Sequence, residues 1–140
     1  MQIPRRGYDH RDVATLVSRL QAEYMLIYGA PDDGPTSAGQ FEPPSGAFGL
    51  GYDGDTPAAM GGWRLREDGR SELRRMYVPD ENRGRGLSRT VLLWLEDSAL
   101  SAGATEMVLE TNQLHLAAIG LYRSAGYTEV PAFGHCTDNP

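Results

Sequence analysis

One segment of this 140-residue chain, SELRRMYVPDENRGRGLS at residues 71–88, constrains the fold more than any other. Its start, SELRRMYV, is predicted to form a β-strand over residues 71–78. Its two faces are expected to carry Leu73, Arg75 and Tyr77 on one side and Glu72, Arg74, Met76 and Val78 on the other. The strand should end at Val78-Pro79-Asp80, because proline has no N–H for a sheet ladder and restricts the residue before it.

Two glycines and two arginines follow this strand in the order Arg83-Gly84-Arg85-Gly86, and an apolar helical pattern begins directly after them. Backbone N–H groups in such a loop can converge on one point, and the N-terminus of the next helix adds a partial positive charge. Residues 83–86, called the anion loop below, are therefore predicted to bind a phosphate-bearing ligand with help from their guanidinium groups.

The composition is that of an ordinary soluble protein and excludes several classes of site. A chain of 140 residues can bury its own core, so we expect one domain over residues 1–140. Cys136 is the single cysteine, which excludes an intrachain disulfide, and no Cys/His group has zinc spacing, so no metal is expected. No apolar run suits a signal peptide or a membrane span, which predicts a cytoplasmic protein without a membrane partner.

The net charge of −6 argues against nucleic-acid binding, because phosphate contacts dominate the affinity of proteins for nucleic acids. The basic segment from residue 74 to residue 89 is a local exception to this acidic balance. The acidic remainder would suit a cationic co-substrate.

Periodicity and turn residues predict the elements of the first half of the chain. A short edge strand is expected over residues 2–7, followed by an amphipathic helix with Asp9 as its N-cap and Gly29 as its stop. Residues 29–44 are rich in Gly, Pro and Asp and are predicted to form a surface loop. Strands over residues 48–52 and 58–65 precede the strand at 71–78, and the Asp-Gly turns between them predict an antiparallel meander.

The second half predicts alternating helices and strands. A helix over residues 86–102 has an apolar face made of Leu87, Val91, Trp94, Leu95 and Ala99. A strand over residues 105–111, a second helix over residues 115–124 and a last strand over residues 127–133 follow. Trp63 and Trp94 are both expected in the core. This order of elements predicts an α/β (or α+β) mixed sheet covered by helices.

The anion loop has two other interpretations. One is a plain tight turn, and the other is part of a dinucleotide-binding fingerprint in which Glu110 would bind a ribose. Against the fingerprint, Arg89 stands where the third glycine belongs, and the preceding strand is amphipathic and charged. A P-loop is excluded, because no Gly-Lys-Ser/Thr follows.

The anion loop resembles the signature of the GNAT (Gcn5-related) N-acetyltransferases, Arg/Gln-x-x-Gly-x-Gly/Ala, which binds the coenzyme A pyrophosphate. Here it reads Arg83-Gly84-Arg85-Gly86-Leu87-Ser88, with Ser88 in place of a small apolar residue. The segment HLAAIGLYRSAGY resembles the family's second cofactor-contacting helix, in which Asn-x-x-Ala-x-x-x-Tyr becomes His115-x-x-Ala118-x-x-x-Tyr122. These motifs cover residues 71–127.

The resemblance implies a GNAT-like fold, in which a mixed, mostly antiparallel central sheet is flanked by helices and two strands splay apart at the cofactor site. A final strand normally follows the last turn in this family. This chain ends at Pro140, so we expect that strand to be truncated, absent, or supplied by a partner such as a second copy in a homodimer.

The resemblance also implies an N-acetyltransferase that moves an acetyl group from acetyl-CoA to a primary amine of a small molecule or peptide in a ternary complex. Backbone groups of Met76, Tyr77 and Val78 would pair with pantetheine, and one N–H there would bind the oxyanion. The implied cofactor-binding residues are completed by Arg83, Gly84, Arg85, Gly86, Leu87, Ser88, His115 and Ala118. The loop over residues 29–44 would shape the acceptor pocket.

Two residues are candidates for the chemistry. By the resemblance, Tyr122 protonates the departing thiolate; the alternative is a buried aromatic residue on the core face of its helix. Glu72 resembles the catalytic glutamate of histone-acetylating members; the alternative is a solvated strand carboxylate paired with Arg74 or Arg64. A non-catalytic acyl-CoA-binding module, which would need neither residue, is the competing hypothesis for the whole chain.

Overall fold

The computed structural model describes residues 3–29, 38–109 and 116–128. The chain divides into two compact units, Met1–Val108 and Leu109–Pro140, and each is described by itself. The first contains α1 (Arg11–Tyr28), η1 (Ala38–Phe41), β1 (Gly46–Asp53), β2 (Thr56–Leu65), β3 (Ser71–Tyr77), η2 (Asp80–Asn82), α2 (Leu87–Ser101) and β4 (Met107–Val108). The second contains α3 (Leu116–Ser124). A single domain over the whole chain stays a prediction.

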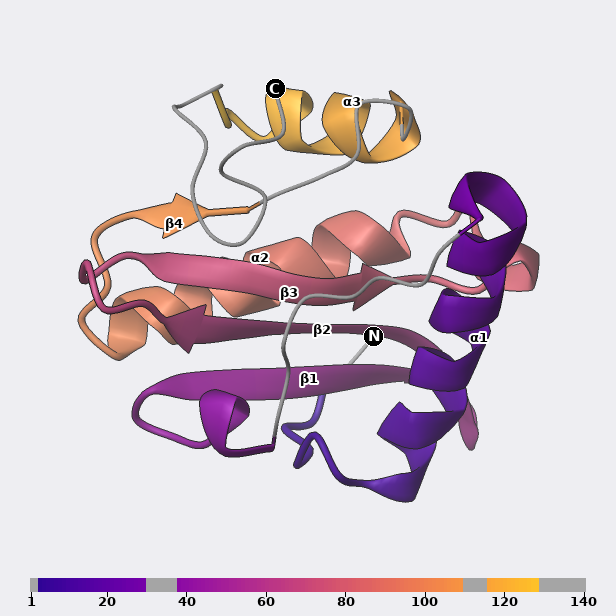
Figure 1. Ribbon diagram of the computed structural model, residues 1–140, viewed down its shortest axis with the longest axis horizontal. Coiled ribbons are helices and arrows are strands. Elements are labelled where there is room, and N and C mark those ends of the chain that lie inside the picture. The colour runs from indigo at the N-terminus through magenta and orange to yellow at the C-terminus, as the bar shows by residue number, and fades with distance from the viewer. Residues whose placement is uncertain (1–2, 30–37, 110–115, 129–140) are drawn as a thin grey trace. The chain divides into compact units, whose positions relative to one another are not determined.

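The described strands form one mixed sheet in the order β1-β2-β3-β4 (Figure 1). The first three strands are antiparallel and β4 is parallel to β3, so the predicted meander and mixed sheet are confirmed. Gly54 has a φ of +62° in the two-residue turn between β1 and β2, a conformation that glycine adopts at little cost. The strand expected over residues 2–7 is reduced to an isolated bridge between Arg5 and Gly49.

Helices cover both faces of the sheet, with α1 in front of it and α2 behind it in Figure 1. The core on the α1 face consists of Val13, Leu16, Leu20, Phe41, Phe48, Leu50, Met60 and Tyr77. The buried face of α2 consists of Leu87, Val91, Leu92, Leu95 and Ala99. Removing these apolar side chains from water is the main force that holds the layers together.

A β-bulge at Arg75 reverses the alternation of side chains along β3. Met60 pairs with Tyr77 while Gly62 pairs with Arg74, so β3 has one residue more than β2 between these pairs. Arg75 takes a positive φ of 59° there. Because the extra residue changes the parity, Tyr77 lies on the α1 face together with Arg74. The expectation that Tyr77 shares a face with Leu73 is therefore wrong.

Several predicted boundaries also need correction. The N-cap of α1 is His10 and not Asp9, since His10 Nδ1 accepts the Asp12 N–H at 3.0 Å. The predicted loop over residues 29–44 contains η1, whose Phe41 is buried in the core. Trp63 is buried as expected, but Trp94 is only half-buried. The predicted helix stop at Gly29 is confirmed, because it takes the left-handed conformation there.

The C-terminal predictions are confirmed only in part. A strand is expected over residues 105–111, and within the described residues β4 covers only Met107–Val108. Residues 110 and 111 lie outside the described residues. Tyr127 and Thr128 are not in a strand, and the rest of the last predicted strand lies outside the described residues, as do His115 and Glu110.

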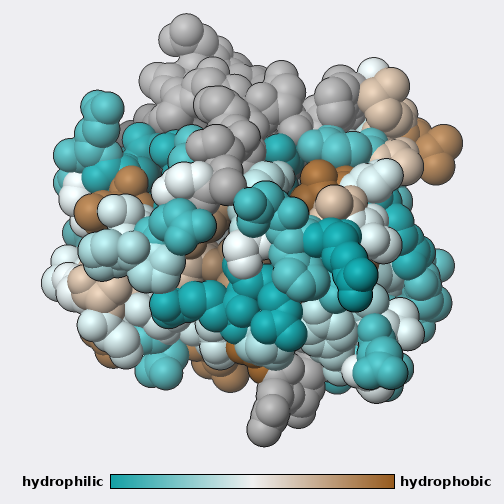
Figure 2. Space-filling view, turned by 90° about the horizontal axis from the view of Figure 1, so that it is seen from below, coloured by the Kyte–Doolittle hydropathy of each residue, from teal (hydrophilic) through white to brown (hydrophobic). Residues whose placement is uncertain are grey.

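The surface is polar where the view in Figure 2 shows it, with hydrophobic residues in small separate areas. Large exposed apolar side chains near the end of α1 are Met25, Leu26 and Ile27. Within the described residues, no helix is both long and apolar enough to cross a membrane.

Candidate cofactor and acyl-transfer site

The anion loop lies between the end of β3 and the start of α2. Gly84 and Gly86 take φ values of +80° and +75°, which side-chain-bearing residues adopt only with strain. Apart from each glycine and its two chain neighbours, no atom of the described residues lies within 4 Å of the place where a Cβ would stand. The two glycines therefore serve the backbone conformation, and the space beside them is open to a ligand.

The N-terminus of α2 offers hydrogen-bond donors to that space. Gly86 is the N-cap residue, so it has no side chain that could accept the N–H groups of the first turn. Its carbonyl accepts the Thr90 N–H at 3.1 Å, which shows that the helix begins directly after the loop. Free N–H groups and the helix dipole together favour an anion at this position.

The two arginines of the loop are bound by protein groups. Arg83 donates from Nε to the Val78 carbonyl at 2.9 Å and pairs through Nη2 with Glu23 Oε1 at 2.7 Å. Arg85 pairs through Nη1 with Asp53 at 3.2 Å and donates to the Asn82 side chain at 3.3 Å. These guanidinium groups therefore hold the loop against β3, α1 and the β1–β2 turn.

Glu23 is a residue of this site that sequence reasoning missed. It projects from α1, and its second carboxylate oxygen accepts a hydrogen bond from the Tyr77 hydroxyl. Burial raises the pKa of Glu23, but the bonds from Tyr77 and Arg83 outweigh this and hold that pKa below its ordinary value. Burial and the bond to Glu23 raise the pKa of Tyr77. The carboxylate is thus ionised and the phenol neutral at physiological pH.

The sequence does contain a signal at Glu23, although it suggests a different pairing. Arg19 and Glu23 stand four residues apart on α1, a spacing that predicts an ion pair within the helix. The structure instead pairs Arg19 with Glu81 and Glu23 with Arg83. The positive and negative charges of Arg19 and Glu23 on α1 are therefore matched by the negative and positive charges of Glu81 and Arg83 after β3.

Within the described residues, β3 pairs with β4 only at its first two positions. The described residues of the two strands pair only at Ser71 with Met107 and at Glu72 with Val108, while β3 continues to Tyr77. Beyond Glu72, the described part of β4 supplies no ladder partner for β3. Met76 and Tyr77 lie in this stretch, and Val78 follows them.

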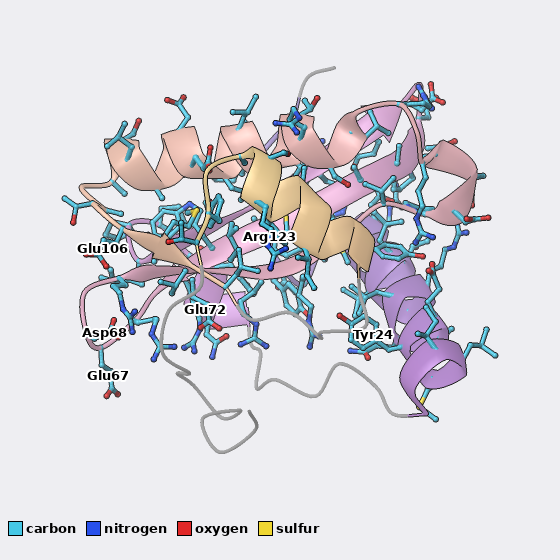
Figure 3. All side chains as sticks on the ribbon, turned by 90° about the horizontal axis from the view of Figure 1, so that it is seen from above. Tyr24, Glu67, Asp68, Glu72, Glu106 and Arg123 are labelled. Atoms are coloured by element: carbon cyan, nitrogen blue, oxygen red, sulfur yellow. The ribbon has the colours of Figure 1, made fainter. Side chains whose placement is uncertain are left out.

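Glu72 lies at the last of these pairs, with its side chain on the side of the sheet away from α2 (Figure 3). It is 5% exposed, and its Oε1 accepts from Arg64 Nε at 3.0 Å and from Arg66 Nη1 at 3.3 Å. The alternative interpretation, a solvated carboxylate paired with Arg74 or Arg64, is therefore wrong in that the carboxylate is buried. It is correct in that Glu72 pairs with Arg64. Its catalytic role stays a prediction.

The face around Glu72 is basic. Arg64 lies directly opposite Glu72, and Arg74, which is 9% exposed, lies opposite Gly62 on the same face. Arg75 donates to the Tyr8 hydroxyl at 3.3 Å. The positive charge of this face is opposite in sign to the net charge of the chain. It does not suit the cationic co-substrate that the acidic composition suggested.

The residues expected from the second helix belong to the second unit. Tyr122 and Ala118 lie in α3, and the Tyr122 ring contacts the Tyr127 ring edge-on at 5.6 Å between centroids. The roles of both residues stay predictions, as does that of His115. The structure thus brings together the site residues from Glu72 to Ser88, and it describes Ala118 and Tyr122 within their own unit.

Comparison with known proteins decides the family. The model of the acetyltransferase (GNAT) family matches residues 13–127. The chain belongs to the GNAT acetyltransferase family. This match confirms the GNAT resemblance and argues against the dinucleotide-binding alternative. Acetyl transfer from acetyl-CoA is general to the family.

Individual GNAT relatives agree with this assignment. An IAA acetyltransferase of Azospirillum brasilense is 35% identical over 74 residues, which cover 53% of this chain and 48% of that protein. The chain thus spans about half the length of this curated relative. A solved structure from Klebsiella pneumoniae, assigned as an acyl-CoA N-acyltransferase, matches 99% of this chain and 90% of its own, with a TM-score of 0.81 and 24% identity. That likeness confirms the GNAT fold.

A second solved structure carries the cofactor of the GNAT family. It is assigned as a streptothricin acetyltransferase of Bacillus anthracis and was solved in complex with acetyl coenzyme A. The match covers 66% of this chain and 52% of that one, with a TM-score of 0.60 and 13% identity.

Proposed function

We propose that this chain transfers an acetyl group from acetyl-CoA to a primary amine of a small molecule or peptide by direct attack in a ternary complex. The observation that carries the proposal is the anion loop: Gly84 and Gly86 in left-handed conformation, beside open space, at the uncapped start of α2. This loop follows the stretch of β3 that the described part of β4 leaves without a ladder partner.

The cofactor is proposed to lie along β3 and the anion loop. Backbone groups of Met76, Tyr77 and Val78 pair with pantetheine, as a strand partner would. The pyrophosphate binds the N–H groups of residues 83–88, and His115 and Ala118 are proposed as further cofactor contacts. One N–H at the end of β3 stabilises the oxyanion, since a preorganised donor costs no reorganisation during the reaction.

The chemistry requires two proton transfers. The neutral amine attacks the thioester carbon, the C–S bond breaks, and the proton of Tyr122 passes to the departing thiolate sulfur. Glu72 takes the proton that the amine loses, directly or through water. The two guanidinium groups that bind its carboxylate keep Glu72 in place on the sheet face.

The basic face favours one class of acceptor. Arg64, Arg66 and Arg74 surround the position of Glu72, so a carboxylate or phosphate on the acceptor would meet favourable charges there. An amine that also carries an anionic group therefore fits this face better than a polycationic peptide.

Calorimetric titration with acetyl-CoA, with NADH as the control, tests the cofactor. We expect micromolar or tighter binding of acetyl-CoA alone, followed by thiol release when amines are added. Binding without thiol release for any amine in a broad panel would instead support the non-catalytic module. Binding of NADH alone would overturn the proposal.

A further inference from the structure

Glu23 joins α1 to two residues of the proposed cofactor site. Its Oε1 pairs with Arg83 at 2.7 Å, and its Oε2 accepts from the Tyr77 hydroxyl. The Arg83 guanidinium also lies over the Tyr77 ring, with 5.9 Å between its central carbon and the ring centroid. Both carboxylate oxygens are thus committed to groups at the end of β3 and in the anion loop.

Arg83 in turn contacts the backbone at the end of β3. Its Nε donates to the Val78 carbonyl at 2.9 Å, and its Nη1 lies 3.4 Å from Asp80 Oδ1. All three of its nitrogens therefore contact protein groups. Holding the Val78 carbonyl limits rotation of the chain where β3 ends, which is where the thioester is proposed to lie.

Stability does not explain this arrangement well. The Arg83 side chain is 47% exposed and that of Glu23 27% exposed, so water screens their attraction. A group that adds little stability can still matter for rate, because small misplacements of a reacting centre are costly.

We propose that Glu23 is a positioning residue for the acetyl-transfer reaction: it holds Arg83, and Arg83 holds the Val78 carbonyl at the end of β3. The proposal rests on the proposed function. It assigns Arg83 a role in orienting the reacting end of the site, while the pyrophosphate is bound by the backbone N–H groups of the loop.

The variant Glu23→Gln tests the proposal, and Glu81→Gln is its matched control. Glu81 pairs with Arg19 at 2.5 Å, so this control also removes an ion pair between α1 and the segment after β3, but it leaves the hydrogen bonds of Glu23 with Arg83 and Tyr77 in place. The readouts are the calorimetric Kd for acetyl-CoA, the rate of thiol release at saturating acetyl-CoA with hydroxylamine as a small nucleophile, and amide exchange over residues 72–79.

In Glu23→Gln we expect thiol release to fall about tenfold, with the Kd for acetyl-CoA changed less than about threefold. Amide exchange over residues 72–79 should rise about threefold, because the end of β3 opens more often. The control should match the parent in all three readouts. Arg83→Lys should reproduce the loss of rate, and the double variant should lose no more than either single one.

Three results would overturn the proposal. The first is a rate and an exchange pattern in Glu23→Gln equal to those of the control. The second is a loss of acetyl-CoA affinity as large as the loss of rate, which would make Glu23 part of the binding site only. The third is a parent protein that binds no acetyl-CoA, which would overturn the proposed function itself and is recognised before any variant is made.

Discussion

Arg64 and Glu72 face each other directly across the β2–β3 ladder: Arg64 Nε donates to Glu72 Oε1 at 3.0 Å, and Arg64 Nη2 lies 2.8 Å from the same oxygen. This contact fixes Glu72 beside the point where β3 and β4 stop pairing among the described residues. It makes the carboxylate a structural element of the sheet as well as the proposed base.

The structural part is tested by Glu72→Ala. Removing the carboxylate takes away an ion-pair partner from the partly buried guanidinium groups of Arg64 and Arg66. We therefore expect the free energy of unfolding to fall by about 1–3 kcal/mol. Urea unfolding measures this. Asp68→Ala, which removes an exposed partner of Arg66, should have a much smaller effect. Equal stability of the two variants would show that the Arg64–Glu72 contact contributes little.

The catalytic part is tested by Glu72→Gln, which retains the shape. We expect kcat to fall about 100-fold while acetyl-CoA affinity stays the same, because a base acts on the acceptor amine and not on the cofactor. Steady-state kinetics with an amine from the screen and calorimetry measure the two quantities. An unaltered kcat would remove Glu72 as the base.

Gly86→Glu should abolish acetyl-CoA binding, because it places a negative side chain in the open space at the start of α2. Gly69→Glu is the matched control, since Gly69 also has a positive φ, of 87°, but lies in the turn before β3. Both variants carry backbone strain of about 1 kcal/mol or more, so circular dichroism should confirm that both fold. Retained binding in a folded Gly86→Glu would refute the anion loop as the cofactor site.

Tyr122→Phe should slow turnover about 10²-fold with acetyl-CoA still bound, because the thiolate then leaves without a proton. Tyr127→Phe is the control, since that ring contacts Tyr122 and has the same chemistry. Burst and steady-state rates of thiol release distinguish the two variants. Equal rates in both would leave Tyr122 as a packing residue.

Stability at alkaline pH should depend on Tyr77. Its folded-state pKa is raised above the ordinary value of 10.0, so the folded chain holds this proton more tightly than the unfolded chain does. The associated stability is fully present below pH 10 and is lost as the pH rises further. Urea midpoints between pH 8 and about pH 11 should therefore fall more steeply in the parent than in Tyr77→Phe. Parallel curves would contradict the assignment.

Acceptor preference should follow the basic face. An ω-amino acid should be acetylated about tenfold more efficiently than the alkylamine of the same length, and Arg74→Gln should reduce this ratio. Comparison of kcat/KM for such pairs measures the preference. A consistent preference for the uncharged partner would show that the arginines serve only the protein's own structure.

Much of the site was readable from the residues 71–88. The strand, the proline that ends it, the two glycines and the helix after them are local features, and all of them are present. The bulge at Arg75 was not readable, because a bulge is defined by pairing with another strand. It moved Tyr77 to the face of α1, where its hydroxyl meets Glu23.

The sequence by itself determined the antiparallel order of β1, β2 and β3 and the glycine-containing turn from β3 into α2, because backbone preferences depend on neighbours along the chain. Only the tertiary structure decided the partners of the charged groups. Glu23 is sixty positions from Arg83, and Arg66 is six from Glu72, yet both pairs form because α1, β2 and β3 pack together. Ion pairs depend on distance in space, which the order of residues alone does not provide.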